Sequence, residues 1–354
     1  MKSNYNQLGQ YIEMVSRTNS DLKYGIEDVR GCSNTKQMMQ TRANLIGRTY
    51  EKFIVLRPQE FVFNRRTTRN GEKIGMAYNN TDREYIFTND YVAFRVKQEY
   101  LDKLLPDYLY MFFCRDEFDR YARYKSTGSA TEFFNWEDMC AVPFEIPPMD
   151  FQQLVVNAYK VLNERIETKQ KINDNLESML TAVYFEQFYS SKASEYTKLS
   201  DLMVFGNGKS RPKTNGTIPV YGGNGVLSYT DKYNAENTVL IGRVGAYCGS
   251  VYLEQSICWV SDNAILAKSK ITNDEFFDYF LLKGLNLFNH HVGTGQQLLT
   301  QDILNNIEVP KPDIKQIGLF NMKAKSVFET ISANKCEIIR LQKLSDLLLA
   351  RLAS

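Results

Sequence analysis

The feature of the sequence that most constrains its fold is a heptad pattern near the C-terminus that recurs near the middle of the chain. Two series of apolar residues repeat at multiples of seven: Ile317, Ala324, Ile331 and Ile338, and Phe320, Val327, Leu341 and Leu348. An apolar seam of this kind is typical of long helices that pair as coiled coils. We therefore expect a long helix over residues 313–354.

A second seam lies 165 residues earlier in the sequence. The polar residues that interrupt the two seams are related by the same offset, since Asn334 corresponds to Lys169 (334 minus 169). The apolar members of the second seam are Val155, Tyr159, Leu162, Ile166, Leu176 and Val183. A polar residue in a seam lowers stability but fixes register and partner. The match predicts a helix over residues 150–190 that pairs with the second helix, antiparallel, through Val155, Leu162, Ile166, Leu176, Phe320, Val327, Ile331 and Leu341. The alternative is two amphipathic helices that each face only a globular core.

The regions before the two helices also share a plan. "FEIPPMDFQQ" enters the first helix and "IEVPKPDIKQ" the second, while upstream "YIFTNDYVAFRV" parallels "SICWVSDNAILAK". The turns "KSTGSATEFF" and "HVGTGQQLL" follow in the same order. This order indicates an old duplication in an α+β chain with approximate twofold symmetry. We expect a strand-rich mixed domain (1–149), a helix (150–190), a second such domain (191–312) and a second helix (313–354), with "SSKASEY" (190–196) as a linker.

Composition excludes several classes of protein. Six cysteines occur without a C-x-x-C pair, and the N-terminus carries no apolar signal segment. No run approaches the roughly 18 apolar residues of a membrane helix, so we expect a soluble, cytoplasmic protein with free thiols. The only histidines are His290 and His291, and no metal site is expected. Because the net charge is only +2, any affinity for nucleic acid must come from local basic clusters.

Motifs of the common enzyme classes are absent. The run "VFGNGKS" ends like a phosphate-binding loop, but the glycine required five residues before Gly208 is Met203. An adenine methyltransferase would carry Asn/Asp-Pro-Pro-aromatic, whereas the only Pro-Pro, in "EIPPMD", is followed by Met149. H-E-x-x-H and G-x-S-x-G do not occur either. We expect no catalytic residues in this chain, and an enzyme with an unfamiliar site is the alternative.

Two basic loops are candidates for binding DNA. "FVFNRRTTRNGEKIG" predicts a hairpin with a cationic tip that carries Arg65, Arg66, Arg69 and Lys73. In the second half, "GNGKSRPKTNG" carries Lys209, Arg211 and Lys213 between glycines. Guanidinium groups at such tips suit phosphates and guanine edges. Charged runs also occur on solvated loops without a ligand, so the alternative is a pair of ordinary surface loops.

The second basic loop is followed by "IPVYGGNGVLSYTDKY", "NTVLIGRVGAYCGSVY" and "SICWVSDNAILAK". These stretches resemble a target recognition domain of the specificity subunits of type I restriction-modification systems. In the first half, "YEKFIVLRPQEFVFNRR" and "TNDYVAFRV" resemble another subclass of the same domain. The further candidate DNA contacts are Tyr221, Asn224, Arg243, Gln296 and Gln297, of which Tyr221 is an equal candidate for the core. The glycines of "YGGNG" are expected to shape the backbone.

The resemblance implies a non-catalytic subunit whose two domains each read one part of a bipartite target in double-stranded DNA, with the paired helices setting the gap. It also implies partners: two copies of an adenine methyltransferase subunit bound to the helices, and an ATP-driven restriction subunit. S-adenosylmethionine, ATP and magnesium would bind those partners, and no cofactor would bind this chain. A coiled-coil scaffold that binds only proteins is the alternative, and salt-dependent binding to duplex DNA would distinguish the two.

Overall fold

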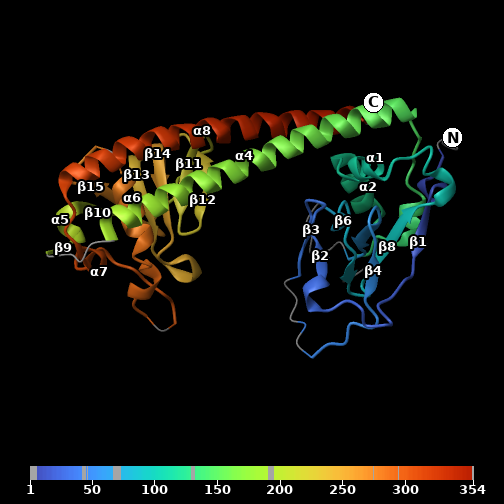
Figure 1. Cartoon of the computed structure of the whole chain (residues 1–354), viewed down its shortest axis with the longest axis horizontal. Helices are drawn as coiled ribbons and strands as arrows, with labels where there is room; N and C mark the ends of the chain where they lie inside the picture. The colour runs from blue at the N-terminus through green and yellow to red at the C-terminus, as the bar shows by residue number, and fades with distance from the viewer. Residues whose placement is uncertain are drawn as a thin grey trace. The chain divides into compact units, whose positions relative to one another are not determined.

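The computed structural model describes residues 6–41, 45, 47–66, 73–128, 132–189, 195–273, 275–293 and 295–352. The chain divides into two compact units: residues 1–168 with 338–354 form unit 1, and residues 169–337 form unit 2. Each unit contains a strand-rich domain and a segment of each of two long helices, which confirms the predicted α+β class (Figure 1). Within the described part of the chain, no helix is long and apolar enough to cross a membrane.

Unit 1 is built on an antiparallel sheet with the strand order β1-β8-β5-β6. These strands are β1 (Ile12–Val15), β5 (Phe61–Asn64), β6 (Met76–Tyr78) and β8 (Tyr91–Val96). Two short ladders join β2 (Arg30–Cys32) to β3 (Met38–Gln40) and β4 (Ile54–Leu56) to β7 (Tyr85–Phe87). The helices are α1 (Pro106–Phe113), α2 (Asp116–Lys125) and α3 (Trp136–Cys140), with 3₁₀ turns η1 (Leu8–Gln10), η2 (Ile26–Asp28) and η3 (Gln98–Tyr100).

Strands β5 and β6 of this sheet are buried on both faces, which accounts for their continuous apolar sequences. Phe61 and Phe63 of β5 join an aromatic core that also contains Phe113 of α1. Val62, between them, points to the other face and packs in a cluster with Phe87 of β7. Phe61, Val62 and Phe63, three of the four residues of β5, are fully buried, so this strand is a well-packed support for Arg65, which directly follows it.

Unit 2 is built on a six-stranded sheet with the order β10-β15-β13-β14-β11-β12. These strands are β10 (Met203–Asn207), β11 (Ile218–Gly222), β12 (Gly225–Thr230), β13 (Ala235–Gly242), β14 (Val251–Val260) and β15 (Ala264–Ser269). A ladder joins β9 (Tyr196–Lys198) to β16 (Glu308–Pro310), so β9 begins inside the predicted linker, whose residues 190–194 lie outside the described part. The helices are α5 (Leu199–Leu202), α6 (Phe276–Gly284) and α7 (Gln301–Asn305), with 3₁₀ turns η4 (Gly245–Tyr247) and η5 (Leu287–His290).

The two sheets share a common core of four strands. The order β1-β8-β5-β6 in unit 1 matches β10-β15-β13-β14 in unit 2, and every neighbouring pair in both sets is antiparallel. In each unit a backbone hydrogen bond also joins the start of the domain to the segment just before a long helix. Leu8 N donates to Val142 O at 2.9 Å, and Leu199 N donates to Ile307 O at 2.9 Å. The repeated order of sequence motifs therefore reflects repeated structure.

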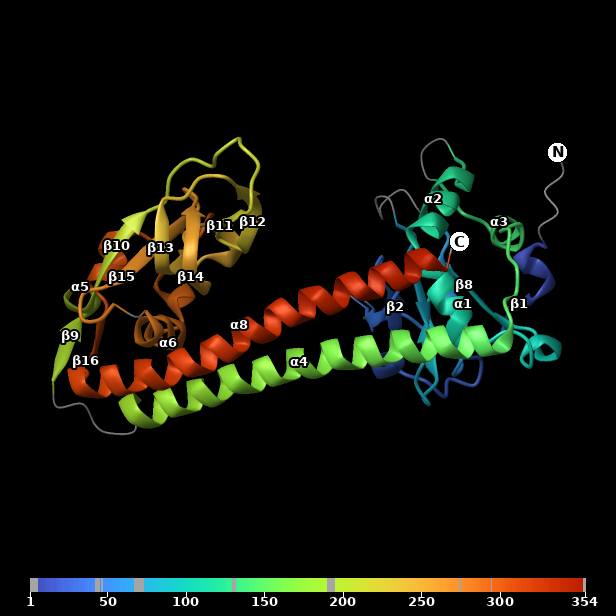
Figure 2. The same ribbon diagram turned by 90° about the horizontal axis from the view of Figure 1, so that it is seen from above.

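The long helices are α4 (Met149–Tyr189) and α8 (Ile314–Arg351), and in each unit their segments lie side by side (Figures 1 and 2). In unit 1, Leu162 and Ile166 of α4 pack with Ile338 and Leu341 of α8. Val155 of α4 packs in the same cluster as Leu348 of α8 in unit 1, and Leu180 in the same cluster as Ile317 in unit 2, so the helices run antiparallel, as expected. The remaining predicted seam residues are buried or half-buried: Val155, Leu176, Phe320, Val327 and Ile331. Of these, Val155 packs into the core of unit 1 and Phe320 into that of unit 2.

A polar layer interrupts the seam in unit 2. Lys169 Nζ donates to Asn334 Oδ1 at 2.9 Å and lies 2.8 Å from the carboxylate of Glu337. Asn334 Nδ2 in turn donates to Asn173 Oδ1 at 2.9 Å. Lys169 and Asn334 are the residues related by the sequence offset, so equivalent positions of the two helices meet each other. The pairing of 169 with 337 and of 173 with 334 again gives an antiparallel orientation.

A buried amide on each long helix holds a domain helix in place. In unit 1, Gln152 of α4 accepts a hydrogen bond from Leu105 N, at the N-terminus of α1, at 2.9 Å. In unit 2, Asn321 of α8 accepts one from Phe277 N, in the first turn of α6, at 2.8 Å. Both amides satisfy helix N–H groups that have no partner within their own helix. Each domain is thereby fixed to a segment of the helix pair.

Candidate nucleic-acid interface

The loops that carry the predicted residues of unit 2 are joined by backbone hydrogen bonds. Lys209 N donates to Val260 O at 2.9 Å, and Arg243 N donates to Asn263 O at 3.0 Å. Residues 261–263 form the turn that follows Val260, so Lys209 is bonded at the start of this turn and Arg243 at its end. Two loops that are far apart in the sequence are thus held next to each other.

The glycine-rich hairpin between β11 and β12 contacts the same turn, since Ser261 N donates to Tyr221 O at 2.9 Å. Gly225 has a φ of +79°, a left-handed conformation that favours glycine. A Cβ at Gly222 would lie 2.5 Å from a side-chain atom of the same hairpin. The glycines therefore shape the backbone, as expected, and they leave the Asn224 side chain exposed at the tip.

Residues 292–293 and 295–298 complete the cluster of loops. Gly245 N, two residues after Arg243, donates to Gln297 O at 3.0 Å. Gln296 is exposed and Gln297 is half-buried. The structure therefore brings together six of the candidate residues: Lys209, Tyr221, Asn224, Arg243, Gln296 and Gln297.

The basic loop of unit 2 borders an open hollow of about 390 Å³. Its lining consists of Arg211, Pro212, Lys213, Thr214, Asn215, Ser228 and Tyr229. Arg211 and Lys213 are exposed, and among the described residues no carboxylate forms an ion pair with either of them or with Lys209. An uncompensated cationic loop of this kind attracts phosphate groups.

Aromatic residues around these loops were not all foreseen. The hydroxyl of Tyr221 donates to Glu254 Oε2 at 2.9 Å, and burial raises the pKa of Tyr221, so this hydroxyl is engaged within the domain. Tyr229 and Tyr247 are 57% and 51% exposed, and the sequence analysis missed them. Their position beside a basic loop and a glycine turn was the available signal, because exposed aromatic rings next to cations can stack on bases.

The predicted basic residues of unit 1 have different surroundings. Arg65 is exposed, directly after β5. Arg66 forms an ion pair with Asp90 at 3.4 Å, and Lys73 forms one with Asp116 at 3.7 Å. These pairs are largely exposed, so they are weak and open to exchange for a phosphate. Arg69 and the expected turn at residues 70–71 lie outside the described residues.

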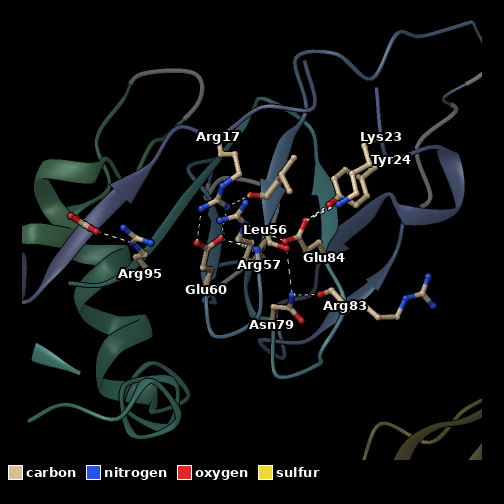
Figure 3. Close-up of polar contacts among 12 residues, drawn as sticks. Arg17, Lys23, Tyr24, Leu56, Arg57, Glu60, Asn79, Arg83, Glu84 and Arg95 are labelled. Carbon is tan, nitrogen blue, oxygen red and sulfur yellow. Dashed lines mark hydrogen bonds and ion pairs between the residues drawn. The ribbon is translucent and has the colours of Figure 1, made fainter. Parts of the chain in front are cut away.

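Other arginines of unit 1 belong to an internal ion-pair network that the sequence did not reveal (Figure 3). Both terminal nitrogens of Arg17 lie 3.1 Å from the carboxylate of Glu60, which is buried. Arg57 Nε lies 3.1 Å from Glu84, and the hydroxyl of Tyr24 donates to the same carboxylate. The Tyr24 hydrogen bond and, to a lesser degree, the charge of Arg57 lower the pKa of Glu84. These arginines stabilise the domain and are not free cations.

Metal ligands do not gather in this chain: among the described residues, no group of three histidine, cysteine, aspartate or glutamate side chains could hold an ion. The candidate interface therefore consists of cations, amides and aromatic rings. These are the groups that bind phosphates, base edges and unstacked bases.

Comparison with known proteins agrees with this chemistry. The family model described as "Type I restriction modification DNA specificity domain" matches twice, over residues 33–178 and 192–345. No protein with a curated description matches the chain by sequence.

One solved structure gives the same fold. The type I restriction-modification system S subunit from M. genitalium is similar with a TM-score of 0.59 at 15% identity, over 99% of this chain and 96% of that one. Two others match with lower TM-scores at 16% identity. A structure of type I R-M system assembly and conformational transition has a TM-score of 0.48, over 98% and 96% of the chains. The HsdS subunit from Thermoanaerobacter tengcongensis has 0.37, over 98% and 95%. Since the family model covers most of the sequence, the chain belongs to the type I restriction-modification DNA specificity domain family, and it carries two copies of that domain.

Proposed function

We propose that this chain is the specificity subunit of a type I restriction-modification complex, which reads a DNA target in two separated parts and has no catalytic activity of its own. The observation that carries the proposal is the convergence of uncompensated basic and amide side chains in a DNA specificity domain. Lys209, Arg211 and Lys213 would bind phosphates, which gives affinity that falls with salt. The amides of Asn224 and Gln297 would read base edges, at about 1–3 kcal/mol for each correct contact.

The duplication supports a bipartite target. Each unit carries the same four-stranded core, but the adjoining segments differ: in unit 1 the basic residues Arg65 and Arg66 follow β5, whereas unit 2 has the glycine hairpin and the basic loop before it. Different loops on equivalent scaffolds would read different sequences. One domain would read each part of the target, and α4 and α8 would set the length of the unread spacer.

Exposed apolar residues on the long helices support docking of two copies of the methyltransferase subunit. Leu154 in unit 1 is 67% exposed, and Leu319, which is 165 positions later (319 minus 154), is 56% exposed in unit 2. Met179 in unit 2 and Leu344 in unit 1 have the same relation and are 49% and 52% exposed. Equivalent patches in the two units would bind equivalent partners. A restriction subunit would complete the assembly in the cytoplasm, with S-adenosylmethionine, ATP and magnesium bound by the partners.

Coexpression tests the proposal. In cells without other adenine methylation, this chain and its companion methyltransferase together should methylate adenines, whereas either one alone should not. Methylation or cleavage by this chain alone would instead favour an enzyme. The purified complex should also bind duplex DNA with an affinity that falls steeply as salt rises. An absence of salt-dependent binding to any duplex would favour a scaffold that binds only proteins.

A further inference from the structure

Each unit holds an arginine at the same place in its sheet. In unit 1, Arg65 follows the last residue of β5, and in unit 2, Arg243 follows the last residue of β13, the equivalent strand. The carbonyl oxygen of Arg65 accepts a hydrogen bond from Phe134 N at 2.9 Å, and that of Arg243 accepts one from Leu299 N at 2.9 Å. The two donors are themselves 165 positions apart (299 minus 134). The two arginines are therefore structurally equivalent.

A repeated turn, here called the docked turn, holds each arginine in place. Its described residues are 127–128 and 132–133 in unit 1 and 292–293 and 295–298 in unit 2. Backbone hydrogen bonds join Thr127 to Phe133 at 3.2 and 2.9 Å, and Val292 to Leu298 at 2.9 and 3.0 Å. The last residue of each turn also forms a β-bridge with the residue after the arginine. The second residue of each turn, Gly128 or Gly293, has a φ of 145° or 93°. The backbone at both arginines is thus hydrogen-bonded to the same kind of turn in the same way.

The side chains of both arginines lack a counterion within the described part of the chain; Arg65 is exposed and Arg243 is half-buried. Among the described residues, neither Arg65 nor Arg243 forms an ion pair or a side-chain hydrogen bond, and Arg243 Nε is buried without a partner. Arg66, next to Arg65, is instead paired with Asp90 at 3.4 Å. A guanidinium that is fixed at its backbone and lacks a counterion is suited to an anion.

The side chains of the two docked turns differ between the units. Glu132 of the turn in unit 1 occupies the position of Gln297 in unit 2, and its charge is countered by Arg123 at 3.0 Å. The neighbouring side chains therefore differ between the units, while the arginine and its support are the same. Two halves that read different sequences share only one feature of their targets, the sugar–phosphate backbone.

We propose that Arg65 and Arg243 bind equivalent phosphates, one beside each half of the target, and set the register in which the variable loops meet the bases. This inference rests on the proposed function, because it assigns a role within the same DNA interface. A phosphate accepts a positive charge from either lysine or arginine, whereas a guanine edge requires the two-pronged guanidinium. Replacement by lysine therefore separates the two kinds of contact.

The test uses the complex of this chain with its methyltransferase, carrying Arg65→Ala, Arg65→Lys, Arg243→Ala or Arg243→Lys. Arg120→Ala, which removes a 69% exposed arginine side chain from α2, is the matched control. One probe is an unmethylated duplex that contains the motif recognised by the wild-type complex. The other is a duplex of equal length in which that motif is scrambled. Each alanine variant should bind both duplexes on the order of tenfold more weakly. The slope of log K against log salt should fall in magnitude by about 0.9. Each lysine variant and the control should stay close to wild type.

Other outcomes would overturn this assignment. Weaker binding to the motif duplex alone, failure of lysine to rescue, or methylation relaxed at one base pair would assign the arginine to a base edge. An unchanged slope of log K against log salt in both alanine variants would show that neither arginine contacts a phosphate. If the wild-type complex binds neither duplex, the proposed function itself fails, and that result is distinct from a failure of the arginine variants alone.

Discussion

Asp278 on α6 is a carboxyl group in the core of unit 2, with 1% of its surface exposed. Burial, and to a lesser degree the neighbouring carboxylate of Glu275, raise the pKa of Asp278 to about 8. In the unfolded chain an aspartate titrates near pH 4. Between about pH 4 and pH 8 the folded state therefore keeps a proton that the unfolded state releases. Stability falls as the pH rises through this window, and the penalty is complete above the folded pKa.

Replacing Asp278 by asparagine removes this proton linkage while preserving the shape of the side chain. We expect the melting temperature of Asp278→Asn, relative to wild type, to be higher at pH 8.5 than at pH 5.5. Thermal unfolding followed by circular dichroism at both pH values measures this difference. Asp174→Asn, at an exposed position of α4, should show no such dependence on pH. Equal pH profiles for Asp278→Asn and wild type would show that Asp278 is ionised in the folded protein.

At the scale of elements, the attachment of each domain to the helix pair depends on a few buried polar groups. Gln152 is fully buried, and besides accepting from Leu105 N it donates to the carbonyls of Lys103 and Pro147, at 2.7 and 2.8 Å. Gln152→Ala would leave these backbone groups buried without partners. Each such group costs about 1–3 kcal/mol.

Urea denaturation should therefore show that Gln152→Ala lowers the free energy of unfolding by about 1–3 kcal/mol or more. Gln153→Ala, one position along and exposed, is the matched control and should stay within about 0.5 kcal/mol of wild type. If the two variants were equally stable, the amide of Gln152 would not support α1.

The sequence predicted the long helices and the strand-rich domains well, because heptad spacing and apolar strands are local patterns. The polar interruptions of the seam also showed the equivalence of Lys169 and Asn334, which are in direct contact. The equivalence of Arg65 and Arg243 was hidden, because it depends on strand order and on hydrogen bonds to residues far along the chain. The bond between Arg17 and Glu60 was hidden for the same reason, since the two residues lie 43 positions apart.

In the proposed function, α4 and α8 together set the length of the unread spacer between the two parts of the target. Residues 161–167 and 337–343 are facing heptads, since they contain the cluster of Leu162, Ile166, Ile338 and Leu341. Removing both heptads together keeps the seam and the register of the remaining pairs. The domains and their loops are unchanged by this deletion. The half-motifs should therefore stay the same while the spacer changes or methylation is lost.

Genome-wide mapping of methylated adenines, in cells that express this chain with its methyltransferase, tests whether the target is bipartite. We predict a motif of two specified parts separated by an unspecified spacer of fixed length. With the paired heptad deletion, we predict the same two parts with a different spacer, or no methylation. A continuous motif in the wild type, no motif in an active complex, or an altered half-motif in the deletion variant would contradict these predictions.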